Sequence, residues 1–396
     1  MKSKILFISH NATRTGAPIE LLRFLKWMKK SSDDPFIVLL EEGGEMESDF
    51  ADIAPTLVWK RPLTSKISIV KMMQEIFRYE GIRNLLKGFL IKIRLSFSNI
   101  SLIYANTVFV GDSFRLIKKK KHHSICRVHE SEPSIREFRS PTGYRSFKYL
   151  SRVCEHFIAV SGSVRDNLVN NHNISSNKVS VIHGSIEHFD TENYISTESI
   201  LQIKRELDIP ENSFVIGAAG WIQHGKGPDI FIKIAENIKK RLKGMNIFFV
   251  WVGGGKDLEL YKKLEKYIKN SEFNSSFRFI GHKEDPYPYY SIFNILALTS
   301  RSDSFPLVNI EAGILGKPVI CFHGSGGSTE WAESGCGYCV PYLDINAFAE
   351  KVIHLIEHPD ELSGLSQICK KNAEAFTTEK TGPKIYNTLQ KVIKKI

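Results

Sequence analysis

Two carboxylates eight positions apart, Asp303 and Glu311, are the residues whose types and spacing point most directly to chemistry. The apolar run before them, 292–300, is typical of a buried parallel strand, and the run after Pro306 is typical of a helix. Asp303 is therefore expected in the loop after a strand, and Glu311 in the first turns of the following helix. Open α/β sheets bind ligands there, because helix N-termini attract anions. Two acids at such a place suit a ligand that carries both phosphate and hydroxyl groups, such as a nucleotide sugar.

A second segment points to the same kind of ligand. Residues 213–220 are expected to form a strand that ends at Gly220, and Pro228 is expected to begin the next helix. The turn between them nearly spells a Walker A loop, but Gly227 replaces the Ser or Thr whose hydroxyl would hold magnesium. A P-loop NTPase is therefore disfavoured. Lys226, in a glycine-rich turn between strand and helix, still points to a phosphate.

These two segments resemble the retaining GT-B glycosyltransferases of family 4. Asp303 and Glu311 match the acid-x7-acid signature, with Asp303 in place of the family's usual Glu, as in a bacterial polysaccharide subgroup. The resemblance covers most of the chain, strongly from 213 to 345 and weakly between 30 and 120. It implies an α/β fold of GT-B type, with two Rossmann-like, doubly wound domains facing across a cleft.

The resemblance also implies a division of labour between domains. We expect an acceptor-binding domain at 1–190 and a nucleotide-sugar-binding domain at 191–378. A C-terminal helix at 379–396 is expected to cross back to the N-terminal domain.

Roles for individual residues follow from the resemblance. Glu311 would hold the ribose hydroxyls of the donor, Asp303 the hydroxyls of its sugar, and Lys226 the diphosphate. Backbone N–H groups at the start of the helix would share the developing phosphate charge. The other donor-binding residues expected are Gly16, Gly220, Gly227, Phe305, Pro306, Leu307 and Val308.

Two N-terminal features complete the expected cleft. Gly16 lies in a loop after the first strand, where the backbone would approach the leaving phosphate or the acceptor. His129 ends another strand and matches the family's histidine that contacts the donor sugar. The chain departs from the family at Trp221, which stands in the place of an arginine. His224, another nearby cation or the N–H groups of the helix would have to supply that second charge.

The implied reaction is transfer of a hexosyl-type sugar from a nucleoside diphosphate with retention of configuration. Its acceptor would be a hydroxyl of a glycan or lipid-linked glycan, in the biosynthesis of cell-surface polysaccharide or lipopolysaccharide. The chain has no Asp-x-Asp sequence. We therefore expect no metal and no other cofactor, with the diphosphate charge met by Lys226 and helix dipoles.

Composition fits a globular enzyme. Hydrophobic residues make up 42% of the 396 residues, and no run of eighteen apolar residues exists. Because the N-terminus leads straight into an expected strand, we predict a cytoplasmic protein. The close pair Cys336 and Cys339 lacks a second pair or a flanking His, so we expect a reduced loop there and no zinc.

Charge is uneven along the chain. Residues 1–190 contain 29 Lys and Arg against 19 Asp and Glu, a net charge of +10, whereas residues 191–396 carry a net charge of +1. Much of the excess lies in 60–97, which has helical apolar spacing with basic residues on its other faces. Such a helix suits an anionic membrane surface, and it equally suits a core-facing helix with a solvated basic face. The lipid-linked acceptors common in the family favour a peripheral membrane protein.

Strands and helices are expected to alternate throughout, with an irregular hinge at 184–193. The first helix is expected at Ile19–Met28. The expected strands are Ile5–Ile8, Phe36–Leu40, Leu102–Tyr104, Ser124–Val128, His156–Val160, Val179–Ile182, Phe214–Ala218, Ile247–Val252, Phe277–Ile280, Ile295–Thr299, Pro318–Phe322 and Tyr338–Val340.

Other functions share some of these features. A nucleotide-sugar epimerase or a phosphorylase on the same fold would use the same cleft. A nucleic-acid-binding protein would explain the charge, but aromatic residues are not interleaved with the basic runs, so no nucleic-acid partner is expected. A catalytically inactive scaffold would not need both Asp303 and Glu311.

Overall fold

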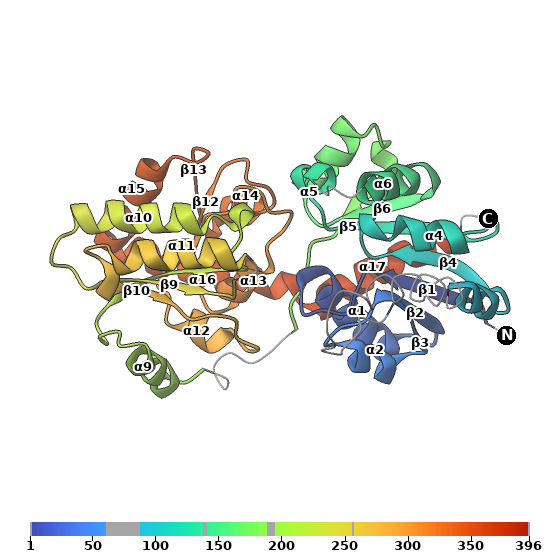
Figure 1. Cartoon of the computed structure of the whole chain (residues 1–396), viewed down its shortest axis with the longest axis horizontal. Coiled ribbons are helices and arrows are strands. Elements are labelled where there is room, and N and C mark those ends of the chain that lie inside the picture. The colour runs from blue at the N-terminus through green and yellow to red at the C-terminus, as the bar shows by residue number, and fades with distance from the viewer. Residues whose placement is uncertain (1, 61–87, 138–140, 188–194, 256, 395–396) are drawn as a thin grey trace, which may run out of the picture. The chain divides into compact units, whose positions relative to one another are not determined.

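The computed structural model describes residues 2–60, 88–137, 141–187, 195–255 and 257–394. The chain divides into two compact units (Figure 1). Unit 1 comprises Met1–His183 and Thr378–Ile396, and unit 2 comprises Gly184–Thr377. Each unit is an α/β layer structure around a parallel sheet.

Unit 1 has a seven-stranded parallel sheet in the order β3-β2-β1-β4-β5-β6-β7. The order reverses between β1 and β4, which makes this the topological switch point of a doubly wound sheet. The strands are β1 Lys4–Ser9, β2 Phe36–Glu42, β3 Thr56–Lys60, β4 Ile100–Ala105, β5 His123–Val128, β6 His156–Ala159 and β7 Val179–Val181.

Helices cover the sheet of unit 1, and the last of them comes from the far end of the chain. Helix α17 packs along α1, and its Ile385, Leu389 and Val392 are buried in the core of this unit (Figure 1). The longer helices are α1 Gly16–Ser31, α2 Glu47–Ile53, α4 Gly111–Ile117, α5 Glu132–Glu137, α6 Pro141–Val153, α7 Gly162–Asp166 and α17 Thr378–Ile393.

Unit 2 repeats the design with six parallel strands in the order β10-β9-β8-β11-β12-β13. Its switch point lies between β8 and β11. The strands are β8 Phe214–Ala219, β9 Ile247–Val252, β10 Phe277–Phe279, β11 Ile295–Leu298, β12 Val319–Phe322 and β13 Gly337–Val340.

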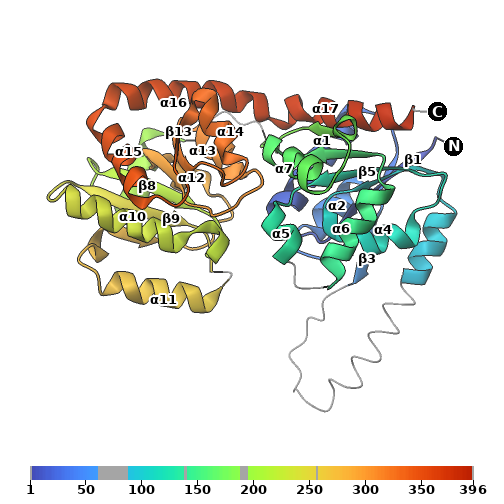
Figure 2. The same ribbon diagram turned by 90° about the horizontal axis from the view of Figure 1, so that it is seen from above.

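The helices of unit 2 lie on both faces of its sheet. Figure 2 shows α10 and α11 on one face and α13 and α16 on the other. The helices are α9 Thr197–Glu206, α10 Pro228–Arg241, α11 Leu258–Lys269, α12 Tyr287–Ser291, α13 Leu307–Ile314, α14 Ser328–Trp331, α15 Ile345–Glu357 and α16 Pro359–Ala373.

Burial on both faces explains the apolar strand sequences. All six residues of β9 are buried, as are all four of β11 and of β12. Parallel strands covered by helices on both sides read as continuous apolar runs, because neither face meets water. The core of unit 2 therefore leaves polar chemistry to the loops at the ends of its strands.

Most of the basic segment 60–97 lies outside the described residues, which end at 60 and resume at 88. Residues 88–96 are helical. In this stretch Ile91 and Leu95 are buried, whereas Phe89, Leu90 and Phe97 are 61%, 62% and 88% exposed. The described part thus has both a core-facing side and exposed apolar side chains.

Candidate active site

The turn after β8 depends on two glycines with positive φ, Gly220 at 138° and Gly227 at 70°. A Cβ atom on Gly227 would lie 2.0 Å from the carbonyl oxygen of Thr299, so packing excludes any side chain there. The Thr299 hydroxyl donates to the Gly227 carbonyl at 2.9 Å. Pro228 then begins α10, where a missing N–H costs nothing. The turn after β8 is thereby fastened to the residue that follows β11.

Lys226 of this turn forms an ion pair with Asp303. Lys226 follows β8 and Asp303 follows β11, so the pair lies at the switch point of the sheet. The two side chains are 24% and 13% exposed, which leaves the pair accessible to a ligand. An ammonium has three donors, so its bond to Asp303 leaves two for an anionic group.

A glycine loop after β12 holds the backbone of Asp303. The N–H of Asp303 donates to Ser325 at 2.7 Å, and the N–H of Gly327 donates to Asp303 at 3.0 Å. A Cβ atom on Gly326 would lie 1.9 Å from the Asp303 carbonyl oxygen. Gly326 is therefore needed for this close approach, and the sequence interpretation did not include it.

Helix α13 begins directly after Pro306, which provides no side-chain cap. Leu307 and Val308 are its first two residues, so their N–H groups have no partner within the helix. Both are half-buried. Glu311 follows Leu307 by four positions and lies on the same face of α13, one turn further on. The N-terminus of α13 thus brings a positive helix end and a carboxylate to one surface.

Phe305 is buried and stacks on Phe376 at a centroid distance of 5.9 Å. Its ring therefore anchors the loop between Asp303 and α13 to the core. Its contribution to a ligand site comes through the backbone that it positions.

Trp221 stacks in parallel on His282, with ring centroids 5.7 Å apart. The second cation at this turn is Arg301, which sequence interpretation missed. Its guanidinium donates to both carboxylate oxygens of Asp229, at 2.9 and 2.7 Å, and to the carbonyl of His224 at 2.7 Å. Partial burial acts to raise the pKa of Asp229, but the bonds from Arg301 lower it overall. Arg301 therefore clamps the turn that carries Lys226.

In unit 1, His129 and Glu130 directly follow β5. Glu130 is buried and accepts hydrogen bonds from the Thr107 hydroxyl and from the N–H groups of Val108 and His129. Burial raises the pKa of Glu130 to about 7, although these bonds act to lower it.

The imidazole of His129 is held neutral. Burial, together with the nearby Arg127 charge, lowers its pKa well below the usual range. Its Nε2 atom is buried and has no hydrogen-bond partner among the residues that the structure describes. Such an atom is costly to leave unpaired, so it is a candidate for contact with a ligand.

Gly16 is the first residue of α1, and its backbone is not strained. A Cβ atom on Gly16 would meet nothing within 4 Å. Packing within unit 1 therefore does not require glycine here, in contrast to Gly227 in unit 2.

The predicted residues fall into two groups. Lys226 and Asp303 are in contact in unit 2, where Gly220, Gly227 and the start of α13 lie on the adjoining turns and loops. Gly16 and His129 belong to unit 1, where each lies at or after the C-terminal end of a strand of the other sheet.

Two sequence profiles, both of glycosyltransferases, match this chain. The sequence profile described as Glycosyltransferase Family 4 matches residues 53–188, and that described as Glycosyl transferases group 1 matches residues 199–376. A D-inositol 3-phosphate glycosyltransferase of Corynebacterium urealyticum is 28% identical over 186 residues, which are 46% of this chain and 44% of that protein. An alpha-galactosylglucosyldiacylglycerol synthase of Streptococcus pneumoniae is 27% identical over 126 residues, 31% of this chain and 32% of that protein. These matched segments span less than half of either relative.

Solved structures share the fold over the whole chain. HepE of Anabaena, crystallised with UDP, superposes with a TM-score of 0.75 at 20% identity, covering 99% of this chain and 100% of that one. WaaG, a glycosyltransferase involved in lipopolysaccharide biosynthesis, superposes with a TM-score of 0.66 at 12% identity, covering 96% and 98%. Two Rossmann-like units, each built around a parallel sheet, define a protein of the GT-B class. Within that class, the chain belongs to glycosyltransferase family 4.

Proposed function

We propose that this protein transfers a sugar from a nucleoside diphosphate sugar to a hydroxyl of a glycan or lipid-linked glycan, with retention of configuration. The observation that carries the proposal is the pairing of Lys226 with Asp303 at the switch point of unit 2. The open N-terminus of α13 and Glu311 follow in the same segment of chain. Complexes of the Anabaena structure with UDP and with UDP-glucose support a donor of this chemistry.

Charge complementarity assigns the parts of the donor. The diphosphate takes the free donors of Lys226 and the N–H groups of Leu307 and Val308, which act as a fixed positive end. The carboxylate of Glu311 accepts hydrogen bonds from the ribose hydroxyls, and that of Asp303 accepts them from the hydroxyls of the sugar. No step needs a metal ion, because these groups stabilise the negative charge of the leaving phosphate.

The reaction exchanges one bond of the anomeric carbon for another. The bond from this carbon to the diphosphate oxygen breaks, and the electron pair leaves with the nucleotide. The acceptor hydroxyl attacks the oxocarbenium-like centre on the face that the phosphate leaves. Its proton passes to the departing phosphate oxygen. Configuration is retained because attack and departure take place on the same face of the sugar. Lys226 stabilises the charge that develops on this oxygen.

Unit 1 is proposed to bind the acceptor. The Nε2 atom of His129, which has no partner among the described residues, is suited to the hydroxyl of a ligand, because a neutral imidazole can accept or donate a hydrogen bond. The open space beside Gly16 allows a ligand to approach the backbone at the start of α1.

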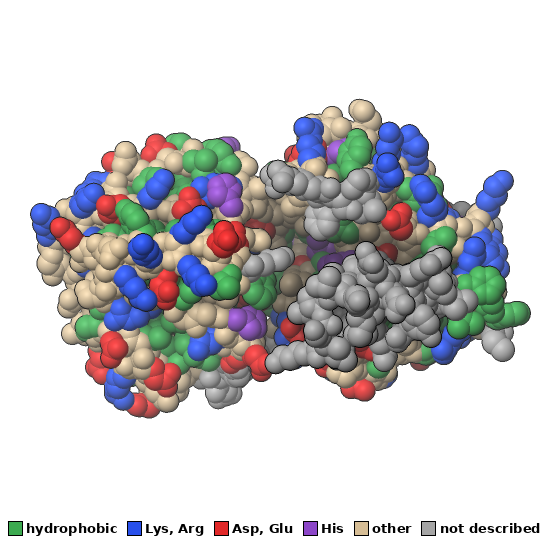
Figure 3. Space-filling model, in the orientation of Figure 1, with side chains coloured by type: hydrophobic (Ala, Val, Ile, Leu, Met, Phe, Trp, Pro, Cys, Tyr) green, Lys and Arg blue, Asp and Glu red, His purple; other side chains and the backbone are tan. Residues whose placement is uncertain are grey.

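A membrane-bound acceptor is supported by the surface of unit 1. Helical residues 88–96 carry exposed apolar side chains together with exposed Lys92 and Arg94. Figure 3 shows hydrophobic side chains beside Lys and Arg side chains at the right-hand edge of the view. The basic run 118–121 lies beside residues 88–96, since the Lys119 ammonium is 3.4 Å from the hydroxyl of Ser96. Exposed apolar groups beside cations suit the interface of an anionic bilayer. None of the described helices is both long and apolar enough to cross a membrane.

The test of this function is loss of turnover at Lys226. Lys226→Ala is expected to lower turnover of the nucleotide sugar by roughly 100-fold or more, because it removes fixed charge at the leaving group. The matched control is Lys262→Ala, an exposed lysine on α11 of the same unit. Both variants should unfold at the same urea concentration as the parent protein. Equal turnover of the two variants would refute the assignment of the turn after β8.

Two conditions of the same assay separate the alternatives. Sugar transfer should require an acceptor, whereas an epimerase would convert the nucleotide sugar without one. Turnover should also persist in excess chelator. Activity that is abolished by chelator and restored by manganese would contradict a metal-independent reaction.

Thermal shift against a panel of nucleoside diphosphates identifies the base, since a ligand at 100 times its Kd stabilises the protein by about 2.7 kcal/mol.

A further inference from the structure

A cluster of metal-ligating side chains lies at the end of β12 and β13, outside the residues assigned to the proposed function. The two strands pair in parallel register with Cys321 opposite Cys339, and their sulfur atoms are 3.5 Å apart. His323 is the first residue after β12, and Glu333 lies in the single π-helical turn Ala332–Cys336. Three separate segments of unit 2 therefore meet at this point.

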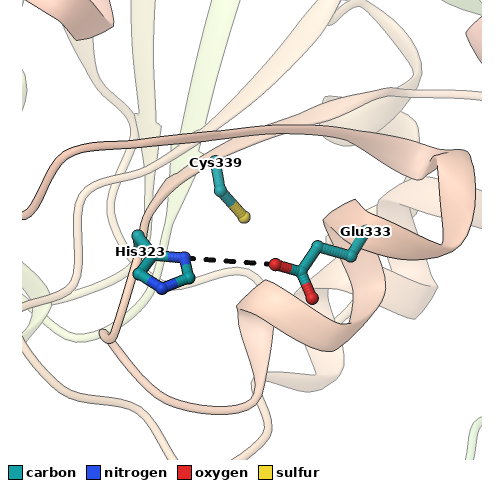
Figure 4. Close-up of side chains that lie close together, drawn as sticks. All are labelled: His323, Glu333 and Cys339. Carbon is teal, nitrogen blue, oxygen red and sulfur yellow. Dashed lines mark ion pairs between the residues drawn. The ribbon is translucent and has the colours of Figure 1, made fainter.

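One ligand atom from each of His323, Glu333 and Cys339 lies within 4.8 Å of the others. Figure 4 shows the imidazole, the carboxylate and the thiol directed toward a common space. The Nδ1 atom of His323 and Oε1 of Glu333 are 4.0 Å apart, which is too long for a hydrogen bond. The imidazole and the carboxylate form only a long ion pair, the dashed line in Figure 4, so both face the same space without a direct hydrogen bond.

We propose that His323, Glu333 and Cys339 bind a zinc ion. Thiolate, imidazole and carboxylate are the ligands that zinc takes in proteins, at about 2.0–2.3 Å. The sulfur of Cys321, 3.5 Å from that of Cys339, is a buried neighbour of the cluster.

The positions of the ligands in the strands support a single site. Cys321 and His323 are two residues apart, and alternation along an extended segment places such residues on the same side. Cys339 is the direct neighbour of Cys321 across the ladder. The side chains of His323 and Glu333 are 70% and 60% exposed, so an ion can reach the site from solvent.

The cluster differs from the cysteine pair that the sequence emphasises. Cys336 does not face Cys339. Its sulfur lies 3.4 Å from the Ser334 hydroxyl and 3.4 Å from the Asn372 amide nitrogen, whereas Cys339 faces Cys321. The expectation of no zinc on this pair therefore does not address the proposed site, whose ligands are His323, Glu333 and Cys339.

An ion here would act on the structure of the donor site and not on the reacting atoms. His323 leads into the loop whose Ser325 accepts the N–H of Asp303. A metal bond to His323 would tie the start of this loop to β13 and to the turn that contains Glu333. The proposal goes beyond the proposed function, because zinc binding requires neither donor nor acceptor.

The experiment uses the full-length protein with its thiols reduced and without nucleotide. Added Zn²⁺ is expected to bind at about one ion per chain and to raise the temperature of unfolding. Added Co²⁺ is expected to give the near-ultraviolet absorption of a thiolate-to-cobalt transition. His323→Ala, Glu333→Gln and Cys339→Ser should each weaken zinc binding by at least about 10-fold. Matched controls are His358→Ala and Glu357→Gln, at exposed positions outside the cluster.

Three outcomes would overturn the proposal. The first is a cluster variant that binds zinc as tightly as the control variants. The second is a reduced protein that binds no zinc at micromolar concentrations. The third is a site that binds no ion but forms a disulfide between Cys321 and Cys339. Glu333→Gln changes an exposed side chain, so it keeps the test decisive if the cysteine variant folds poorly.

Discussion

Lys226 and Asp303 neutralise each other in the same site that is proposed to hold a diphosphate sugar. The ion pair keeps the ammonium at the switch point before a donor arrives. When phosphate oxygens approach, the ammonium can turn its remaining donors to them while Asp303 accepts from sugar hydroxyls. A charge held in place by its partner costs less reorganisation when the leaving group develops its own charge.

This arrangement predicts different effects for the two acids. Glu311→Gln should weaken binding of a nucleoside diphosphate by about 1.5–3 kcal/mol, because a charged hydrogen bond to ribose is lost. Asp303→Asn should not weaken that binding, because it leaves Lys226 fully available to the diphosphate. The same variant should cut transfer from the intact donor. Calorimetry with the nucleotide alone, and turnover with the sugar nucleotide, measure the two effects.

The assignment fails under two results. One is an equal loss of nucleotide affinity in both variants. The other is unimpaired transfer by Asp303→Asn, which would leave the sugar without its proposed acceptor of hydrogen bonds.

Glu130 predicts a pH dependence of stability in unit 1. Its pKa is raised from 4.5 to about 7, so the folded state binds the proton more tightly than the unfolded chain. Its contribution favours folding fully below pH 4.5 and is lost as the pH rises to about 7. The difference in free energy of unfolding between Glu130→Gln and the parent protein should therefore shift in favour of the variant by on the order of 3 kcal/mol as the pH rises from 4.5 to 7.

Urea unfolding at pH 4.5, 6 and 8 measures this change. Asp52→Asn, at an exposed carboxylate of the same unit, is the control. A difference between Glu130→Gln and the parent protein that stays constant with pH would show that the buried carboxyl does not titrate in this range.

Motifs made of adjacent residues were accessible from the sequence, whereas partners from distant segments were not. The family resemblance and the spacing of Asp303 and Glu311 located the turn and the helix that the structure describes. Arg301 was missed, because its partner Asp229 lies 72 positions away and nothing in its local sequence marks it. Gly326 was missed because its glycine requirement comes from the backbone of Asp303, in another loop.

Among the elements, the turn after β8 is tightly constrained by packing. Gly227→Ala should lower the free energy of unfolding by about 2 kcal/mol or more, since it combines a positive φ with a Cβ atom 2.0 Å from Thr299. Gly225→Ala, two residues earlier in the same turn, should change it by less than about 0.5 kcal/mol, because its Cβ atom would meet nothing within 4 Å. Urea unfolding of both variants is the measurement, and equal midpoints would contradict the packing described here.

The expectation of an α/β fold with two Rossmann-like sheets is confirmed. Each strand expected in unit 2 is present. The four inner strands, β8, β9, β11 and β12, are almost entirely buried, so their sequences are continuously apolar. β3 at Thr56–Lys60 was not predicted. It lies at the edge of its sheet and is half-buried along most of its length, so it lacks such a run. The first helix extends from Gly16 to Ser31, beyond the expected Ile19–Met28, because neither Gly-Ala-Pro at its start nor Lys-Lys-Ser at its end shows apolar helical spacing.

For the whole molecule, the excess positive charge of the N-terminal half predicts salt-sensitive binding to anionic liposomes. The double variant Lys92→Gln and Arg94→Gln should weaken this binding by about 2 kcal/mol, at about 1 kcal/mol for each cation near the surface. The variant Lys262→Gln and Lys263→Gln removes the same charge from unit 2 and should bind as the parent protein does. Flotation assays at two salt concentrations give the result. Equal flotation of both variants would mean that residues 88–96 do not contact the bilayer.

The return of α17 to unit 1 has a consequence for how the chain is made. Unit 2 is one continuous segment, Gly184–Thr377, whereas unit 1 needs Thr378–Ile396 as well as Met1–His183. Ile385, Leu389 and Val392 are buried in the core of unit 1 and follow all of unit 2 in the sequence. During synthesis, the N-terminal unit must therefore wait with part of its core open until all of unit 2 has emerged. The order in which the two units become complete is the reverse of the order in which they begin.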